Sequence, residues 1–381
     1  MFQKIAVLGA GNGGYAMAAD LSMSGYDVNL YEDPDFAANL DAIKAKGGIE
    51  VIAKKHTGEN IKLSAGGSTG FVSMKGEITS NIKKALDGTD LIMLIVPAFV
   101  REKFIRSMAP FLENGQTIVI WPAYFGALQC YNLLREIGVK KDITICETES
   151  ILYVARKIGS NKISIMGTKN KLLLSAIPSS NTNKVMKDLK TIYPQLVEAE
   201  NVFETTFSNV NTVLHPQSVL LNLYRVERQF YPYYEILNGA FCSEYDVTPG
   251  MAKVMEKVDR EKVNLAKKYG VNILSLQETL KNFYDASGEN LYETILNCYA
   301  YKNQVAPSSI TSRYVTEDLL FALVPFVYLA NQIGENLPVT KGMVEIGKAA
   351  TGIDFWKDGL NLKNLGLYGK NIDEIKKYLS N

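Results

Sequence analysis

The sequence predicts two domains: an α/β domain built on a doubly wound parallel sheet, followed by an all-α domain. In the first half, short apolar runs alternate with stretches of helical spacing, which favours parallel strands joined by helices. From about Thr205 onward, long patterned stretches follow one another with few turn signals. A length of 381 residues suits two domains. From pattern alone, we expect them at residues 1–190 and 191–381.

The first half opens on an apolar run at residues 4–8, which is typical of a strand buried on both faces. A glycine-rich turn follows, then a helix over residues 15–24 that Gly25 closes, and a second strand over residues 27–31. Strand, helix and strand within about 30 residues form a βαβ unit. Each of the later strands is also followed by a segment that suits a helix, and we expect these strands at residues 90–96, 116–120 and 142–146.

The second half is expected to be mostly helical, and it shows no internal repeat and no low-complexity linker. Apolar residues recur there at helical spacing over stretches longer than an ordinary strand. These stretches are residues 219–229, 251–268, 273–283, 316–332 and 342–349.

Charge, hydropathy and cysteine spacing exclude several classes of protein. The 41 Lys and Arg residues balance 40 Asp and Glu for a net charge of +1, which gives no electrostatic basis for binding nucleic acid or an anionic membrane. The longest apolar run, residues 319–330, is shorter than the roughly 20 residues that span a bilayer. The N-terminus runs directly into a strand pattern, without room for a signal peptide. We therefore expect a cytoplasmic protein. It should have neither disulfides nor a metal site, because its cysteines lie far apart: Cys130, Cys146, Cys242 and Cys298.

The glycine-rich turn matches the dinucleotide-binding pattern G-x-G-x-x-G of Rossmann domains. Gly9 permits the tight turn, Gly11 lets the backbone approach a pyrophosphate, and Gly14 lets helix and strand pack closely. The diphosphate would lie at the positive end of the following helix. A glycine-rich turn that binds nothing, or an FAD site, stays open as an alternative. The expected cofactor-binding residues of the turn are Gly9, Ala10, Gly11, Asn12, Gly13 and Gly14.

An acidic residue at the end of the second strand favours NAD(H). Glu32 follows the turn at close to the roughly 20 residues expected of a ribose ligand. A carboxylate there accepts ribose hydroxyls and repels a 2′-phosphate, and no arginine follows it closely, so NADP(H) is less favoured but not excluded. Pro97 and Pro122 end two further strands, where ligands of parallel sheets bind. Pro97 is therefore a candidate cofactor residue, although ordinary helix initiation explains both prolines equally well.

One of the two histidines is a candidate acid–base residue. His215 precedes Pro216, which suits the first position of a helix, so we expect His215 at the mouth of that helix. Histidine exchanges protons near neutral pH because its unperturbed pKa is about 6.5. A histidine that caps the helix or fills an interface is an equally good interpretation. His56 lies in a polar stretch and is expected to be solvated.

Near the C-terminus, Arg313 and Asp318 are further candidates. Thr316 followed by two acidic residues is what a plain helix start would show, and that interpretation stays open. Arg313 has no role in such a cap. Its guanidinium can form two parallel hydrogen bonds with a carboxylate, which makes it a candidate anchor for an organic acid.

Taken together, these residues resemble the opine dehydrogenase family, of the octopine/nopaline dehydrogenase type, over nearly the whole chain. The more specific parts are His215-Pro216 with Asn222 seven residues on, and the segment Arg313-Tyr-Val-Thr-Glu-Asp318. The other matching segments are Gly9 to Gly14, Arg225-Val-Glu227, Thr248-Pro249, Asp259-Arg-Glu261, Trp356 to Gly359 and Leu365-Gly-Leu367.

The resemblance implies an enzyme that condenses the amino group of an amino acid with the keto group of a 2-oxo acid, commonly pyruvate, using NAD(P)H, and that catalyses the reverse reaction. The family's catalytic histidine falls on His215, the aspartate that pairs with it on Asp318, and its substrate-binding arginine on Arg313. We expect Asn222 to contact substrate as well.

We expect these two acids to be the small-molecule partners, with no nucleic acid or membrane partner, and we leave a homodimer open. Two other functions also stay open. One is a hydroxy-acid dehydrogenase that reduces an oxo acid without any amine, and the other is a dinucleotide sensor without turnover. The residues do not identify the amine, since the aromatic side chains that suit a pocket are more typical of core: Tyr233, Tyr234, Tyr245 and Tyr284.

Overall fold

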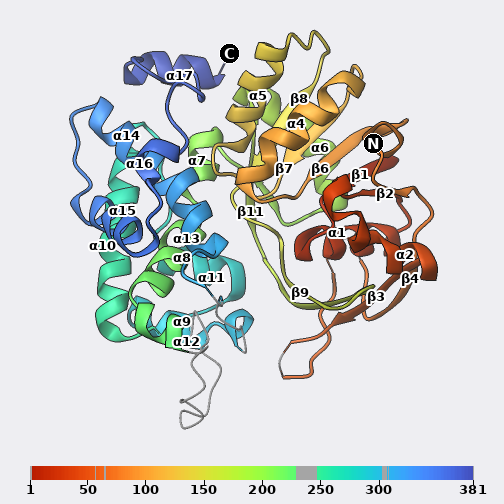
Figure 1. The fold of residues 1–381 in the computed structure, drawn as a ribbon, viewed down its shortest axis with the longest axis horizontal. Helices are drawn as coiled ribbons and strands as arrows, with labels where there is room; N and C mark the ends of the chain where they lie inside the picture. Colours follow the sequence, from red (N-terminus) through yellow and green to blue (C-terminus); the bar gives the residue numbers. More distant parts are fainter. Residues whose placement is uncertain are drawn as a thin grey trace. The chain divides into compact units, whose positions relative to one another are not determined.

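The structure, a computed structural model, describes residues 2–55, 57–63, 66–228, 247–302, 307 and 309–380. The chain forms two compact units, one of Met1–Thr205 with Tyr378–Asn381 and the other of Thr206–Lys377. The described strands all belong to the first unit, as Figure 1 shows. The predicted fold class, an α/β Rossmann unit followed by an all-α unit, is confirmed for the described residues.

The large sheet of the first unit has the strand order β12-β11-β8-β7-β6-β1-β2-β5. Neighbours run parallel, except that β11 is antiparallel to β8, so the sheet is mixed at one edge. Because β2 and β6 flank β1 on opposite sides, the strand order reverses at β1, where open sheets bind ligands. The strands are β1 (Lys4–Leu8), β2 (Asp27–Tyr31), β5 (Ile78–Thr79), β6 (Leu91–Leu94), β7 (Thr117–Ile120), β8 (Thr144–Thr148), β11 (Leu172–Ile177) and β12 (Leu196–Glu198).

A second sheet, which the sequence did not predict, has the order β4-β3-β10-β9. We expected a helix after each strand of the parallel sheet, but the chain leaves β8 for the antiparallel pair β9–β10, so that expectation is wrong there. The strands of this sheet are β3 (Gly48–Ala53), β4 (Gly70–Ser73), β9 (Tyr153–Gly159) and β10 (Lys162–Thr168).

The helix after the glycine-rich turn lies between the two sheets. It begins at Asn12, earlier than expected, and contacts strands of both sheets. Its residues from Gly14 to Leu21 are all buried, as a helix covered on several sides requires. The helices of this part of the chain are α1 (Asn12–Met23), α2 (Asp41–Lys46), α3 (Ile82–Leu86), α4 (Arg101–Met108), α5 (Gly126–Ile137), α6 (Thr182–Ile192) and α7 (Val202–Phe207), with short turns η1 (Pro34–Leu40), η2 (Ala98–Val100), η3 (Ala109–Phe111) and η4 (Ser179–Asn181).

The first unit extends beyond the boundary expected at residues 190/191. The strand β12 lies after that boundary and still pairs with β11 of the large sheet. Because its backbone hydrogen bonds belong to the sheet, the segment that carries it stays with the first unit up to Thr205.

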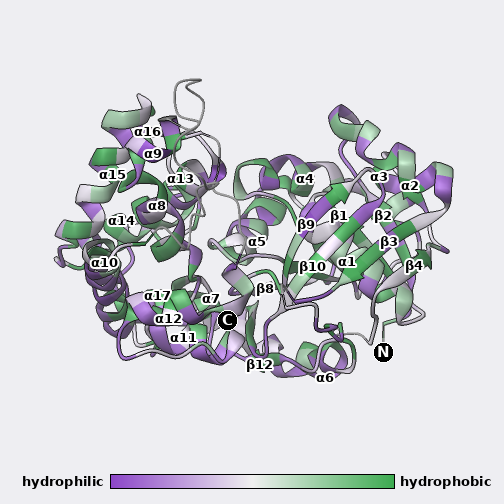
Figure 2. Ribbon diagram, turned by 90° about the horizontal axis from the view of Figure 1, so that it is seen from below, coloured by the Kyte–Doolittle hydropathy of each residue, from purple (hydrophilic) through white to green (hydrophobic). Residues whose placement is uncertain are grey.

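Among the described residues of the second unit, the regular secondary structure is helical, and Figure 2 shows hydrophobic and hydrophilic residues alternating along these helices. Such amphipathic helices bury one face against their neighbours. They are α8 (Asn211–Leu220), α9 (Leu223–Arg228), α10 (Pro249–Lys268), α11 (Leu276–Tyr284), α12 (Leu291–Asn297), α13 (Arg313–Asp318), α14 (Val324–Gln332), α15 (Pro338–Thr351), α16 (Phe355–Asp358) and α17 (Ile372–Ser380), with short turns η5 (Tyr299–Tyr301) and η6 (Leu319–Leu323).

Several polar residues from the segments that carry the family resemblance act as helix caps in this unit. The Thr248 hydroxyl accepts the N–H of Met251 at the start of α10. Asp259 accepts the N–H of Leu276 at 2.7 Å at the start of α11. Glu261 accepts two backbone N–H groups at the start of α15, which satisfies donors that a helix leaves without internal partners. The resemblance at these positions therefore reflects the fold.

The segment Arg313–Gln332 runs as one helical rod in which the turn η6 is a π-helix. Pro325 follows this turn, and the wider π-turn accommodates a ring that would clash with the preceding carbonyl of an α-helix. By length and composition the rod could cross a membrane, but 72% of its most apolar window is buried inside the protein. It is a core helix of the second unit.

Candidate active site

The turn between β1 and α1 has two positions that only glycine tolerates. Gly9 has a φ of +104°, and a Cβ there would lie 2.4 Å from the carbonyl oxygen of Ile95. A Cβ on Gly14 would lie 1.7 Å from the carbonyl oxygen of Gly9. A Cβ on Gly11 would meet nothing within 4 Å. The turn therefore leaves open space at the N-terminus of α1, where backbone N–H groups and the helix dipole favour a diphosphate.

Glu32, the first residue after β2, is held beside this turn by the backbone. One carboxylate oxygen accepts the N–H of Ala10 at 3.0 Å, and the other accepts the N–H of Asp33 at 2.9 Å. The amide nitrogen of Asn39 lies 3.4 Å from the first oxygen. The side chain is only 8% exposed, so its position is fixed. A carboxylate fixed at this strand end suits the ribose hydroxyls of NAD(H).

The other three candidate cofactor residues are also at this end of the sheet. The side-chain oxygen of Asn12 accepts the backbone N–H of Lys157 on β9 at 2.8 Å. A Cβ on Gly13 would lie 2.9 Å from the Ile95 side chain, so β6 ends against the first turn of α1. Pro97 directly precedes η2 and α4 at the end of β6. It begins helical structure there, as the alternative interpretation of this proline expects.

Sequence reasoning missed two lysines that the fold brings to this region. The Nζ of Lys157 lies 4.0 Å from the centroid of the Tyr15 ring, a cation–π contact. Burial lowers the pKa of Lys157, and the charge of Glu32 opposes that change. Lys103 on α4 forms an ion pair with Asp33 at 2.8 Å. Nothing in the sequence pointed to either lysine, because each lies on an element distant along the chain from Glu32.

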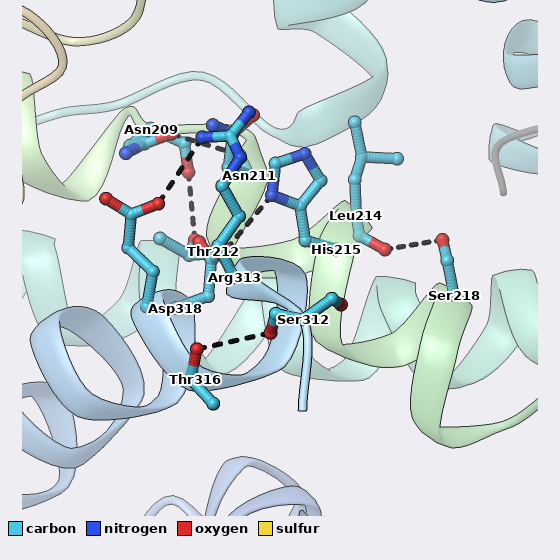
Figure 3. Close-up of polar contacts among 11 residues, drawn as sticks. Asn209, Asn211, Thr212, Leu214, His215, Ser218, Ser312, Arg313, Thr316 and Asp318 are labelled. Carbon is cyan, nitrogen blue, oxygen red and sulfur yellow. Dashed lines mark hydrogen bonds and ion pairs between the residues drawn. The ribbon is translucent and has the colours of Figure 1, made fainter. Parts of the chain in front are cut away.

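His215 and Asp318 point toward each other in the second unit, as Figure 3 shows. Nδ1 of His215 lies 3.0 Å from Oδ2 of Asp318. The aspartate side chain is fully buried, whereas 11% of the histidine side chain is exposed. A carboxylate accepts hydrogen bonds only, so it holds the proton on Nδ1 and leaves Nε2 as the nitrogen that can exchange protons.

The two residues of this pair occupy other helix positions than expected. Pro216 lies inside α8, so His215 is on the helix and not at its mouth. Because proline has no N–H, it removes the donor that would meet the Thr212 carbonyl one turn earlier. The plain helix start proposed at Thr316 is also wrong, because α13 begins at Arg313 after Ser312. Asp318 therefore lies at the far end of α13, where its carboxylate binds the histidine instead of capping a helix.

Tyr314 stacks on the catalytic candidate, a contact that sequence reasoning missed. The rings of His215 and Tyr314 have centroids 3.8 Å apart and planes only 9° from parallel. The hydrogen bond to Asp318 restricts movement of the imidazole within the plane of its ring. The stacking on Tyr314 restricts movement perpendicular to that plane. The motif position beside Arg313 was the only available signal.

Arg313 extends from the first turn of α13, with Asn209 and Asn211 nearby in Figure 3. Its Nη1 lies 3.4 Å from a carboxylate oxygen of Glu317, which is 3% exposed, whereas 42% of the Arg313 side chain is exposed. The buried carboxylate restrains the guanidinium, which stays accessible to a solute. Asn209, also missed, accepts the N–H of Asn211, and its buried amide nitrogen has no hydrogen-bond partner among the described residues.

The remaining candidates divide into three groups. Asn222 lies in the turn between α8 and α9, and its amide donates to the Ser218 carbonyl at 2.9 Å. Tyr284 is buried within an aromatic cluster, as expected of a core residue. Several residues named from the sequence lie outside the described part of the chain: His56, Tyr233, Tyr234, Cys242 and Tyr245.

Comparisons with known proteins match both units. The family model described as NAD/NADP octopine/nopaline dehydrogenase, alpha-helical domain, matches residues 198–351. The model described as NAD-dependent glycerol-3-phosphate dehydrogenase N-terminus matches residues 4–123. Over 372 residues the chain is 31% identical to an opine dehydrogenase of Arthrobacter sp. (strain 1C), and the aligned residues cover 97% of this chain and 97% of the relative.

Solved structures show the same fold. Octopine dehydrogenase with NADH and L-arginine matches with a TM-score of 0.73 at 20% identity, over 99% of this chain and 98% of that chain. The same enzyme with NADH and pyruvate matches with a TM-score of 0.70 at 21% identity, over 96% and 95%. Yersinopine dehydrogenase with NADP+ bound matches with a TM-score of 0.69 at 14% identity, over 100% and 98%.

Proposed function

Since this chain belongs to the octopine/nopaline dehydrogenase family of opine dehydrogenases, we propose that His215 is its acid–base residue, with Asp318 as its partner and Arg313 as the anchor of a substrate carboxylate. The protein is an NAD(P)-dependent oxidoreductase that condenses an amino acid reductively with a 2-oxo acid. One observation carries the proposed roles: the 3.0 Å contact between His215 and an aspartate without solvent exposure.

The glycine-rich turn and Glu32 would hold the cofactor. The open space at Gly11 suits a diphosphate, and the carboxylate of Glu32 suits the adenosine ribose, which favours NAD(H) without excluding NADP(H). When bound, the reduced nicotinamide supplies the hydride for the new C–H bond. Gly9 and Gly14 shape the turn, and Ala10, Asn12, Gly13 and Pro97 position it.

In the proposed mechanism, the amino nitrogen joins the keto carbon of the oxo acid, water leaves, and the resulting C=N bond is reduced. Arg313 holds a substrate carboxylate through its guanidinium, which places the keto carbon near His215. Nε2 of His215 donates a proton to the oxygen that leaves as water. In the reverse direction it accepts a proton. Asp318 keeps the other ring proton on Nδ1 and stabilises the imidazolium.

Asn222 is proposed as a further substrate contact. It lies in the turn directly after α8, the helix that carries His215. Its side chain is partly exposed, and its amide is oriented by the Ser218 carbonyl.

L-arginine and pyruvate are bound by octopine dehydrogenase, and we propose the same two classes, an amino acid and a 2-oxo acid, as partners of this chain. We also propose a cytoplasmic location, because Cys130 and Cys146 are buried and form no disulfide. A homodimer is the assembly to be tested by light scattering.

The test is NADH oxidation with pyruvate and a pool of the twenty amino acids, against controls that omit either component. Consumption that requires both components supports reductive condensation, and dividing the pool then identifies the amine. Consumption with pyruvate alone would instead establish a hydroxy-acid dehydrogenase. A His215→Ala variant that binds NADH but has lost turnover in both directions supports the acid–base role, whereas full activity in that variant would overturn it.

A further inference from the structure

Lys157 lies beside the cofactor turn although it belongs to the second sheet. It is on β9, an edge strand of that sheet, and its backbone N–H donates to the side chain of Asn12, the first residue of α1. Its ammonium group lies 4.0 Å from the ring centroid of Tyr15, which is in the first turn of α1. The hydrogen bond and the ring contact together fix this lysine at the N-terminal end of α1.

The ring under Lys157 also connects it with the ribose-binding carboxylate. The hydroxyl of Tyr15 donates to the carbonyl oxygens of Asn39 and Ser160. The amide of Asn39 in turn contacts Glu32. The ammonium group therefore lies over a side chain that extends from the first turn of α1 to Asn39, the residue that contacts Glu32.

Lys157 differs from the neighbouring lysines in its charge environment. Lys103 pairs with Asp33, and Lys162 on the adjoining strand pairs with Glu50 at 2.6 Å. Within the described part of the chain, Lys157 forms no ion pair, and its half-buried side chain has lost part of its hydration. Burial accordingly lowers its pKa. A partly dehydrated cation gains most from an anion that arrives with a ligand.

We propose that the ammonium group of Lys157 binds a phosphate group of the dinucleotide, most directly its diphosphate, because the lysine is fixed to the residue that begins α1. The inference rests on the proposed cofactor site and adds a cation from the second sheet to it. A helix N-terminus supplies backbone donors to a phosphate, and an ammonium group supplies the compensating charge.

The test is a fluorescence titration of NADH and NADPH binding to the full chain without other substrates. Lys157→Met removes the charge and keeps an apolar stem against Tyr15, and Lys157→Arg keeps the charge. Lys162→Met is the matched control on the same hairpin, because its ion-pair partner is a surface carboxylate. Thermal melting confirms that each variant is folded.

Loss of a charge-assisted contact should weaken binding in Lys157→Met about 10-fold. We expect equal loss for NADH and NADPH, with Lys157→Arg and Lys162→Met within about threefold of the wild type. A loss confined to NADPH also supports a phosphate contact and assigns it to the 2′-phosphate. Unchanged affinity for both dinucleotides in folded Lys157→Met would overturn the inference. Failure of the wild type to bind either dinucleotide would overturn the proposed function itself.

Discussion

Replacing Asp318 by asparagine keeps the shape of a fully buried side chain and removes only its charge. In the native protein its Oδ2 lies 3.0 Å from Nδ1 of His215. An asparagine that accepts the Nδ1 proton through its oxygen preserves the tautomer but stabilises the imidazolium less. An asparagine that presents its amide nitrogen instead imposes the opposite tautomer and leaves no basic Nε2.

The expected loss of activity follows from these two cases. A hydrogen bond to a charged partner contributes about 1.5–3 kcal/mol, and each 1.36 kcal/mol of transition-state stabilisation is about tenfold in rate. Loss of the charge alone should therefore lower kcat about 10- to 150-fold. Reversal of the tautomer should bring the loss toward about 10⁴-fold, the effect of the same substitution in a His–Asp pair of a protease.

The assay is steady-state NADH oxidation in the presence of both substrates, combined with a separate measurement of NADH binding. NADH affinity should stay within about twofold, because Asp318 and the cofactor turn belong to different units. Asp259→Asn is the matched control, since it makes the same change at a buried carboxylate of the same unit that caps α11 and pairs with Lys262 at 3.0 Å but lies on another helix than His215 and Asp318. It should lower the melting temperature without the loss in kcat.

A double variant completes the design. If His215 and Asp318 act as one unit, adding Asp318→Asn to His215→Ala should lower kcat little further. A folded Asp318→Asn enzyme with kcat within twofold of the wild type would refute the proposed pairing. Equal losses in the Asp318→Asn and Asp259→Asn enzymes would assign the effect to general destabilisation.

Three further predictions follow from single contacts. Gly14→Ala places a Cβ 1.7 Å from a backbone oxygen of the turn, so it should lower the free energy of unfolding by about 1–3 kcal/mol and weaken NADH binding, as chemical denaturation and titration would show. Tyr314→Leu removes the ring stacked on His215 and should lower kcat by up to about 10-fold. Tyr314→Phe keeps an aromatic ring at this position and should keep the kcat of the wild type. Equal activity of the two variants would contradict a positioning role. Burial raises the pKa of Asp33, but the hydrogen bonds from Lys103 and the backbone outweigh it and hold that pKa below its ordinary value of 3.8. The contact therefore stabilises the fold above pH 3.8 and loses this effect as the pH falls through the lowered pKa, so the difference in melting temperature between wild type and Lys103→Met should shrink in that range.

Local patterns in the sequence were sufficient to predict the central βαβ unit and the glycine-rich turn that follows its first strand. The positions of Gly9, Gly11 and Gly14 report close approaches within a few residues, which any sequence with this turn must satisfy. Glu32 follows from the length of one helix and one strand. Residues this close along the chain meet through regular geometry, so their spacing predicts their contact.

Family resemblance, and not spacing, indicated His215 and Asp318, since 103 residues separate them along the chain. The residues themselves left a catalytic role and a helix cap equally open, and the positions expected for them, a helix mouth at His215 and a helix start at Thr316, were wrong. Pro216 is tolerated inside α8, and the true start of α13 lies at Arg313. Local capping signals compete with tertiary packing, and here packing outweighs them.

Contacts between elements that are distant along the chain could not be predicted from the sequence and were seen only in the folded structure. The second sheet places Lys157 against Asn12 across 145 residues, and packing of α13 against α8 lays Tyr314 on the histidine ring. The strand β12 likewise returns to the large sheet after the expected boundary. Periodicity shows which face of an element is buried, but the neighbour that covers this face is selected by the packing of the whole unit.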